Sequence, residues 1–150
     1  DRPDVTFDSL EPATGEVYAS FPIRSAVEVQ AAVARAKEAT GWWQELGFKG
    51  RKERLDAWKA ILARRMPELA EVMHKETGKP VGDAQLELLL AIDHIAWAGK
   101  NAARVLGSRK VSAGMLMANQ AASLEYQPLG VVGVIGPWNY PVFTPMGSIV

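Results

Sequence analysis

The sequence predicts an α/β fold in which several helices are followed by a hairpin and then by a buried strand that leads into another helix. Three observations support this fold class. Apolar residues recur at helical spacing through most of residues 25–106. Short alternating pieces with few helix signals follow Gly107. A β-branched run then leads from Gly130 to Ile135, as in strands that a parallel sheet covers on both faces.

The N-terminal part is predicted to contain a strand followed by a helix. Residues 16–21 alternate loosely between apolar and polar side chains and indicate a strand. Ser25 and Glu28 form a capping-box pattern, so a helix should begin there and end near Thr40–Gly41. The residues expected on its buried face are Val29, Val33 and Ala36.

Three more helices are predicted up to residue 106. The first carries apolar residues at helical spacing, namely Leu55, Trp58 and Leu62. Pro67 suits the first turn of the next helix, and Gly78 suits its C-terminal cap. A long helix then runs from about Val81 to Leu106. Its expected buried stripe consists of Leu88, Leu89, Ile92, Ile95, Ala96 and Gly99.

The chain changes character after Gly107. Residues 108–128 predict two or three short antiparallel strands, with a hairpin turn near Ala113–Gly114. Gly136 and Pro137 break the apolar run, and residues 142–150 predict the start of a further helix.

Composition excludes several kinds of protein. The 150 residues contain 17 Lys and Arg against 17 Asp and Glu, so the basic excess of a nucleic-acid binder is missing. No cysteine is present, which rules out disulfides, thiolate metal sites and a cysteine nucleophile within these residues. Two histidines, His74 and His94, argue against a His-rich metal site. Because the apolar run stops at Val150 without a polar tail, we expect a fragment of a longer protein.

The loop "GPWNYP", residues 136–141, carries the strongest chemical signal. Ligands bind at such strand-to-helix crossovers in open α/β sheets. Pro137 and Pro141 restrict the backbone, so the Asn139 amide would be held in place, as an oxyanion donor requires. The alternative is a simple turn in which the asparagine bonds its own backbone.

Two other interpretations of this region are weaker. The glycines at 130, 133 and 136 fit neither the dinucleotide fingerprint nor a phosphate loop, and close packing of the strand is favoured. Residues 126–150 carry no charge, which raises the alternative of a membrane-anchored helical protein. Three prolines and Asn139 argue against a spanning helix there.

The stretch "PLGVVGVIGPWNYP" resembles the strand and loop that open the cofactor cleft of the aldehyde dehydrogenase superfamily. The pieces "PATGEVYASFP", "AVARAKEATGWW" and "ETGKP" match the same family in order and spacing. The resemblance implies a Rossmann-like cofactor-binding domain without the usual glycine fingerprint. Residues 1–107 would be its N-terminal helical part, 108–128 an oligomerisation arm, and 129–150 its first buried strand and loop. The catalytic domain would lie beyond residue 150.

The resemblance also implies a role for each loop residue. Asn139 would donate its amide to the oxyanion of a cysteine thiohemiacetal, and Tyr140 would flank the substrate tunnel. NAD or NADP would lie against Ile135, Gly136, Pro137 and Trp138. No metal is implied.

The implied activity is oxidation of an aldehyde to a carboxylic acid in a cytoplasmic homodimer or homotetramer, joined through residues near 108–127. The nucleophilic cysteine, the general-base glutamate and the lysine at the cofactor ribose would all lie beyond Val150, so residues 1–150 should be inactive alone. No nucleic-acid or membrane partner is expected. The alternative is a non-catalytic binding or assembly module on the same fold.

Overall fold

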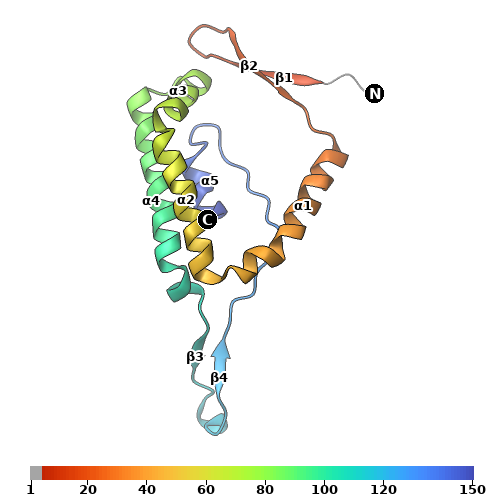
Figure 1. Ribbon diagram of the computed structural model, residues 1–150, viewed down its shortest axis with the longest axis vertical. Helices are drawn as coiled ribbons and strands as arrows, with labels where there is room; N and C mark the ends of the chain where they lie inside the picture. The colour runs from red at the N-terminus through yellow and green to blue at the C-terminus, as the bar shows by residue number, and fades with distance from the viewer. Residues whose placement is uncertain (1–4) are drawn as a thin grey trace.

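The computed structural model describes residues 5–150 and has five helices and two small antiparallel sheets in that range. In chain order the elements are β1 (Thr6–Leu10), β2 (Val17–Pro22), α1 (Ala26–Glu45), α2 (Gly47–Arg64), α3 (Met66–Thr77), α4 (Val81–Leu106), β3 (Arg109–Val111), the 3-10 turn η1 (Met115–Met117), β4 (Ala122–Leu124) and α5 (Phe143–Ile149). Helices α2 to α5 form a bundle, from which α1 stands apart, and the two hairpins lie at opposite ends (Figure 1).

The core of the bundle lies around α4, which packs against α2, α3 and α5. Its fully buried apolar residues recur every three or four positions, so they form one stripe along the helix. They are Ala84, Leu88, Ala91 and Ile95. The alanines let the neighbouring helices approach closely, while Met73 of α3 and Met146 of α5 fill the space between them.

The predicted stripe on α4 is partly wrong. Leu88 and Ile95 are buried as expected, but the Leu89 side chain is 51% exposed. A neighbouring residue on a helix is rotated by about 100°, so Leu89 points to the side of the stripe. Glu87 takes a buried place instead, with 1% of its surface exposed.

Most helix boundaries agree with the local signals. The capping box is present, because the Glu28 N–H donates to Ser25 Oγ at 3.3 Å and the Ser25 N–H donates to Glu28 Oε2 at 2.8 Å. Pro67 lies in the first turn of α3, and Gly78 ends that helix in the left-handed region with φ of 71°. Helix α4 has the predicted bounds, Val81 to Leu106.

Helix α1 differs from the prediction in its end and in its burial. It continues past Thr40–Gly41 to Glu45, because the glycine with a positive φ at this junction is Gly47, at 59°, and not Gly41. It has no buried residue among those described. The predicted face, Val29, Val33 and Ala36, is exposed because α1 stands away from the bundle (Figure 1).

The two hairpins account for all the assigned strands between residues 5 and 150. Strand β2, Val17–Pro22, overlaps the strand predicted at 16–21 with a shift of one residue, and it pairs antiparallel with β1. Strands β3 and β4 confirm an antiparallel hairpin within 108–128. The connection is wider than a tight turn at Ala113–Gly114, because it includes η1.

The prediction of a buried strand from Gly130 to Ile135 is wrong for the described residues. No strand is assigned there, and the Val132 and Ile135 side chains are 59% and 97% exposed. A strand is stabilised by backbone pairing with a neighbour, and none of the strands between residues 5 and 150 pairs with this segment. The helix predicted after the loop is present as α5.

Candidate functional site

The loop at residues 136–141 lies between the extended apolar segment and α5, beside the junction of α3 and α4 (Figure 1). Asn139 is exposed, and its side-chain amide forms no hydrogen bond with residues 5–150. Its backbone carbonyl accepts a hydrogen bond from Lys79 Nζ at 2.7 Å. The backbone of Asn139 is therefore held by Lys79, while its side-chain amide is free. The alternative, a turn in which the asparagine side chain bonds its own backbone, is not what the structure shows.

Two charged residues that the sequence analysis did not single out hold this loop. The buried Glu87 carboxylate pairs with Lys79 Nζ through Oε2. Its Oε1 accepts hydrogen bonds from the backbone N–H groups of Val142 at 2.9 Å and Phe143 at 3.1 Å. A buried carboxylate is tolerated only when such partners surround it. Glu87 lies at a position where the helical repeat of α4 places apolar residues. A charged residue at such a position is the sequence signal that indicates a buried carboxylate.

The other predicted site residues share the loop but differ in their surroundings. Ile135 and Trp138 are 97% and 81% exposed. The Tyr140 ring lies 4.0 Å from Lys79 Nζ in a cation–π contact. A Cβ added to Gly136 would lie 3.0 Å from Pro145 Cγ, so the start of the loop packs directly on α5. The adjacent Pro137 is partly buried.

The histidines do not form a metal site. His74 Nδ1 lies 2.7 Å from the Lys79 carbonyl oxygen, and the His94 ring packs 4.8 Å from Phe143. The described part of the chain holds no group of three His, Asp or Glu residues placed to bind a metal ion. Across residues 5–150, none of the helices has the length and apolarity needed to cross a membrane.

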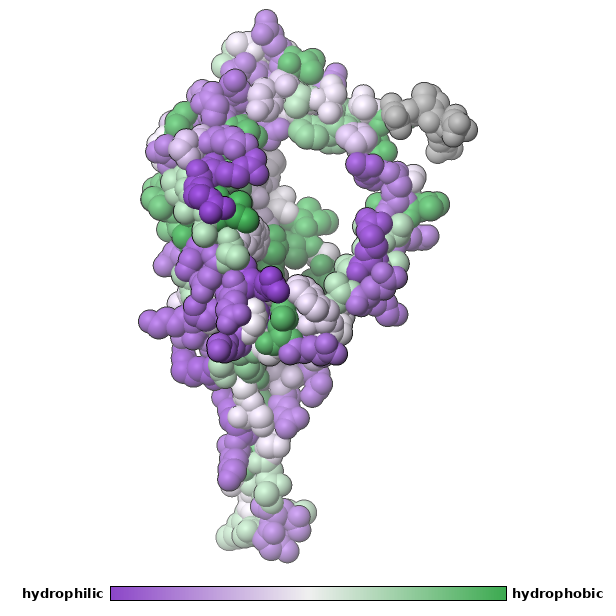
Figure 2. Space-filling view, in the orientation of Figure 1, coloured by the Kyte–Doolittle hydropathy of each residue, from purple (hydrophilic) through white to green (hydrophobic). Residues whose placement is uncertain are grey.

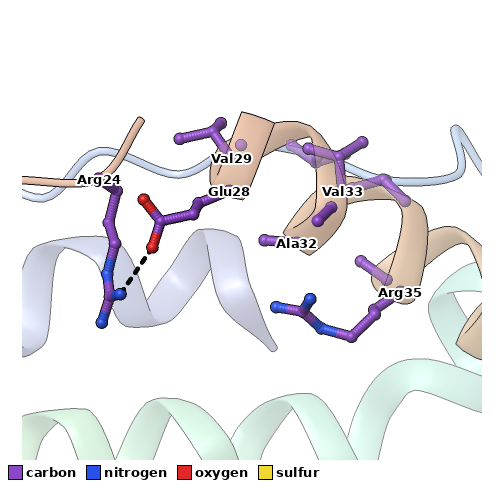
Figure 3. Close-up of a pocket in the computed structure, with 11 residues that line it drawn as sticks. Arg24, Glu28, Val29, Ala32, Val33 and Arg35 are labelled. Atoms are coloured by element: carbon purple, nitrogen blue, oxygen red, sulfur yellow. Dashed lines mark hydrogen bonds and ion pairs between the residues drawn. The ribbon is translucent and has the colours of Figure 1, made fainter. Parts of the chain in front are cut away.

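A wide hollow of about 760 Å³ lies between α1 and residues 131–133 (Figure 3). Its carboxylate, Glu28, pairs with Arg24 at 2.8 Å. The hydrogen bond from the Ser25 backbone, followed by that from Arg24, lowers the pKa of Glu28 to about 2. Such a group stays ionised at neutral pH and is a poor general base. Since the remaining wall is mostly Val and Ala, the chemistry is better sought on the loop.

Comparisons with known proteins agree with one another. The sequence profile described as "Aldehyde dehydrogenase family" matches residues 1–150. A probable NADP⁺ succinate-semialdehyde dehydrogenase of Sinorhizobium fredii is 33% identical over 135 residues, covering 90% of this chain and 27% of that protein. An NAD(P)⁺ succinate semialdehyde dehydrogenase of Escherichia coli is 32% identical, covering 95% of this chain and 30% of that protein.

Solved structures show the same relationship. The NADP-dependent glyceraldehyde-3-phosphate dehydrogenase of Bacillus halodurans, complexed with NADP, has a TM-score of 0.87 at 29% identity and covers 97% of this chain. An aldehyde dehydrogenase of Brucella melitensis also has a TM-score of 0.87, at 27% identity. The chain spans less than a third of these relatives' lengths. With a family match along its whole length, the chain belongs to the aldehyde dehydrogenase family.

Proposed function

We propose that the intact protein is an NAD(P)⁺-dependent aldehyde dehydrogenase, in which residues 1–150 supply the oxyanion donor Asn139 and part of the cofactor site. The observation that carries this proposal is the free, exposed amide of Asn139 on a loop whose backbone is held by Lys79. A donor that is already oriented stabilises developing charge without a cost of reorganisation.

The proposed chemistry begins with a cysteine thiolate from outside these residues. Its sulfur forms a bond to the aldehyde carbon, and the π electron pair of the carbonyl moves to oxygen. Asn139 would donate a hydrogen bond to that oxyanion. The C–H electron pair then leaves as hydride and the C=O bond re-forms as a thioester. Water hydrolyses the thioester to the carboxylic acid, the thiolate and a released proton. NAD⁺ or NADP⁺, when bound, accepts the hydride.

Ile135, Gly136, Pro137 and Trp138 would hold the cofactor. The exposed side chains of Ile135 and Trp138 offer apolar surface beside a loop packed firmly on α5, which suits a flat nicotinamide ring. Tyr140 would border the substrate tunnel. The names of the relatives support both NADP and NAD as cofactors.

The proposed domain division places residues 1–107 and 129–150 in a Rossmann-like cofactor-binding domain and residues 108–128 in an oligomerisation arm. The β3–β4 hairpin lies at one end of the bundle, which supports a separate arm (Figure 1). Catalysis would require the domain beyond residue 150.

Replacing Asn139 tests the proposed role in the intact protein. With succinic semialdehyde as the first substrate, Asn139→Ala should lower the rate of hydride transfer by about 10²- to 10³-fold, because one oxyanion donor is lost. The dissociation constants of NAD⁺ and NADP⁺ should change little. Stopped-flow measurement of NAD(P)H formation gives the rate.

Asn101→Ala is the matched control, because Asn101 lies on α4 and its side chain bonds the Trp97 carbonyl of the same helix. It should leave the hydride-transfer rate unchanged. An unchanged rate in Asn139→Ala would contradict the proposed role. If the intact protein oxidises no aldehyde with either cofactor, the non-catalytic module is the better interpretation.

A further inference from the structure

The Lys79–Glu87 pair joins three elements at the candidate site. Lys79 comes from the turn between α3 and α4, and Glu87 lies about two turns into α4. Their contacts reach Asn139 in the loop and Val142 directly after it. The Glu87 side chain is 1% exposed and that of Lys79 is 14% exposed. Glu87 is thus as buried as the apolar core and Lys79 is partly buried, whereas the ion pairs on the helix surfaces are more exposed.

Each contact of the pair restrains a different part of the loop. Lys79 Nζ donates to the Asn139 carbonyl oxygen at 2.7 Å and lies over the Tyr140 ring at 4.0 Å. Glu87 Oε1 accepts from the two N–H groups that begin α5. Lys79 therefore restrains the peptide plane after Asn139, and Glu87 restrains the start of α5.

We infer that Lys79 and Glu87 are positioning residues for the oxyanion donor, acting through the backbone of Asn139. This inference rests on the proposed function of Asn139. Fixing the carbonyl of Asn139 restricts the rotation of its peptide and so the direction in which its side chain leaves the backbone. Misplacement of a reacting group by about 1 Å can cost about 10²-fold in rate, so the hydrogen bond from Lys79 to the Asn139 carbonyl has a catalytic consequence.

A variant that tests the inference must remove the hydrogen bond from Lys79 to the Asn139 carbonyl without leaving an unpaired buried charge. Lys79→Met alone would strand the Glu87 carboxylate, which is strongly destabilising. In the double variant Lys79→Met/Glu87→Gln, the glutamine carbonyl can still accept from Val142 and Phe143, so α5 keeps its acceptor. Circular dichroism and thermal unfolding of the intact protein check that the variant is folded.

The double variant should lower the rate of hydride transfer by about 10- to 100-fold, with the aldehyde KM and the cofactor Kd nearly unchanged. Lys79→Arg, which keeps the charge and the donor, should recover most of the rate. Lys75→Met is the matched control, because Lys75 lies in the last turn of α3 and contacts the exposed Glu71 at 3.7 Å and the Tyr18 ring at 5.6 Å, neither of which belongs to the loop. It should leave the rate at its original value.

Repeating the measurements in the Asn139→Ala background separates positioning from general structure. The backbone carbonyl at 139 remains there, so a purely structural effect would persist, whereas an effect through the amide should vanish. Equal losses in the two backgrounds, or no loss in the double variant, would overturn the inference. Full activity of Asn139→Ala would instead contradict the proposed role of Asn139 as oxyanion donor, on which the inference about Lys79 and Glu87 rests.

Discussion

At the scale of single residues, side chains of the same type and close in sequence differ in how much of their surface is buried. Leu86, Leu88 and Leu89 are chemically identical and lie within four positions of α4, yet only Leu88 is fully buried. It packs with Ala70 and Met73 of α3. The free energy that a leucine contributes is therefore decided by its angle around the helix and not by its hydrophobicity.

Leu88→Ala should lower the free energy of unfolding of the intact protein by about 2–5 kcal/mol, because it removes buried methyl groups and leaves a cavity. Leu86→Ala, at a position that is 56% exposed, should change it by less than about 0.5 kcal/mol. Chemical denaturation of both variants gives the comparison. Equal effects at the two positions would contradict the helix orientation described above.

At the scale of elements, helix ends are set by local chemistry that is independent of the rest of the fold. The reciprocal bonds of Ser25 and Glu28 begin α1, and the left-handed Gly78 ends α3. Gly78 directly precedes Lys79. The turn at Gly78 therefore sets the direction of the Lys79 side chain, which reaches the Asn139 carbonyl in the loop. A change of backbone conformation at this residue would thus reach the candidate site.

Gly78→Ala should destabilise the intact protein by about 1–2 kcal/mol, since a Cβ is costly in the left-handed region. The added atom would meet no close neighbour, because Pro12 is 3.7 Å away, so the cost is that of the backbone alone. Gly82→Ala, within α4 and in open space, should be neutral or stabilising by up to about 1 kcal/mol. Thermal unfolding of this matched pair is the measurement. Destabilisation by Gly82→Ala of the same size would argue against this explanation.

At the scale of the whole molecule, much apolar surface remains uncovered between residues 5 and 150. Figure 2 shows apolar side chains around the opening between the bundle and α1 and at the tip of the β3–β4 hairpin. At that tip, Met115 and Leu116 are 90% and 92% exposed. Exposed apolar surface of this kind marks an interaction site, which supports the proposed arm.

Leu116→Asp should weaken self-association of the intact protein, because a charge would be buried at the proposed contact between arms. Sedimentation velocity over a range of concentrations should show a lower average mass. Leu86→Asp, on the exposed side of α4, is the control and should keep the original mass. An unchanged mass in Leu116→Asp would contradict self-association through the hairpin.

Local features could be predicted from the sequence: the helix starts and ends around Ser25, Pro67 and Gly78, the bounds of α4, the hairpin, and the position of the "GPWNYP" loop. These depend on contacts within a few residues along the chain, so they can be recognised without the fold. The choice of Asn139 also came from the sequence, through resemblance to a family that the chain belongs to.

The residues that surround this loop could not be predicted from the sequence, because they come from distant parts of the chain. Lys79 is 60 positions from Asn139 and Glu87 is 55 positions from Val142 in the chain, and no local pattern pairs a lysine with a distant backbone carbonyl. The exposure of Val29, Val33 and Ile135 was likewise decided by packing, because an apolar face is buried only where a partner covers it. Burial and long-range hydrogen bonds depend on how the elements meet, and this is the information that a local pattern lacks.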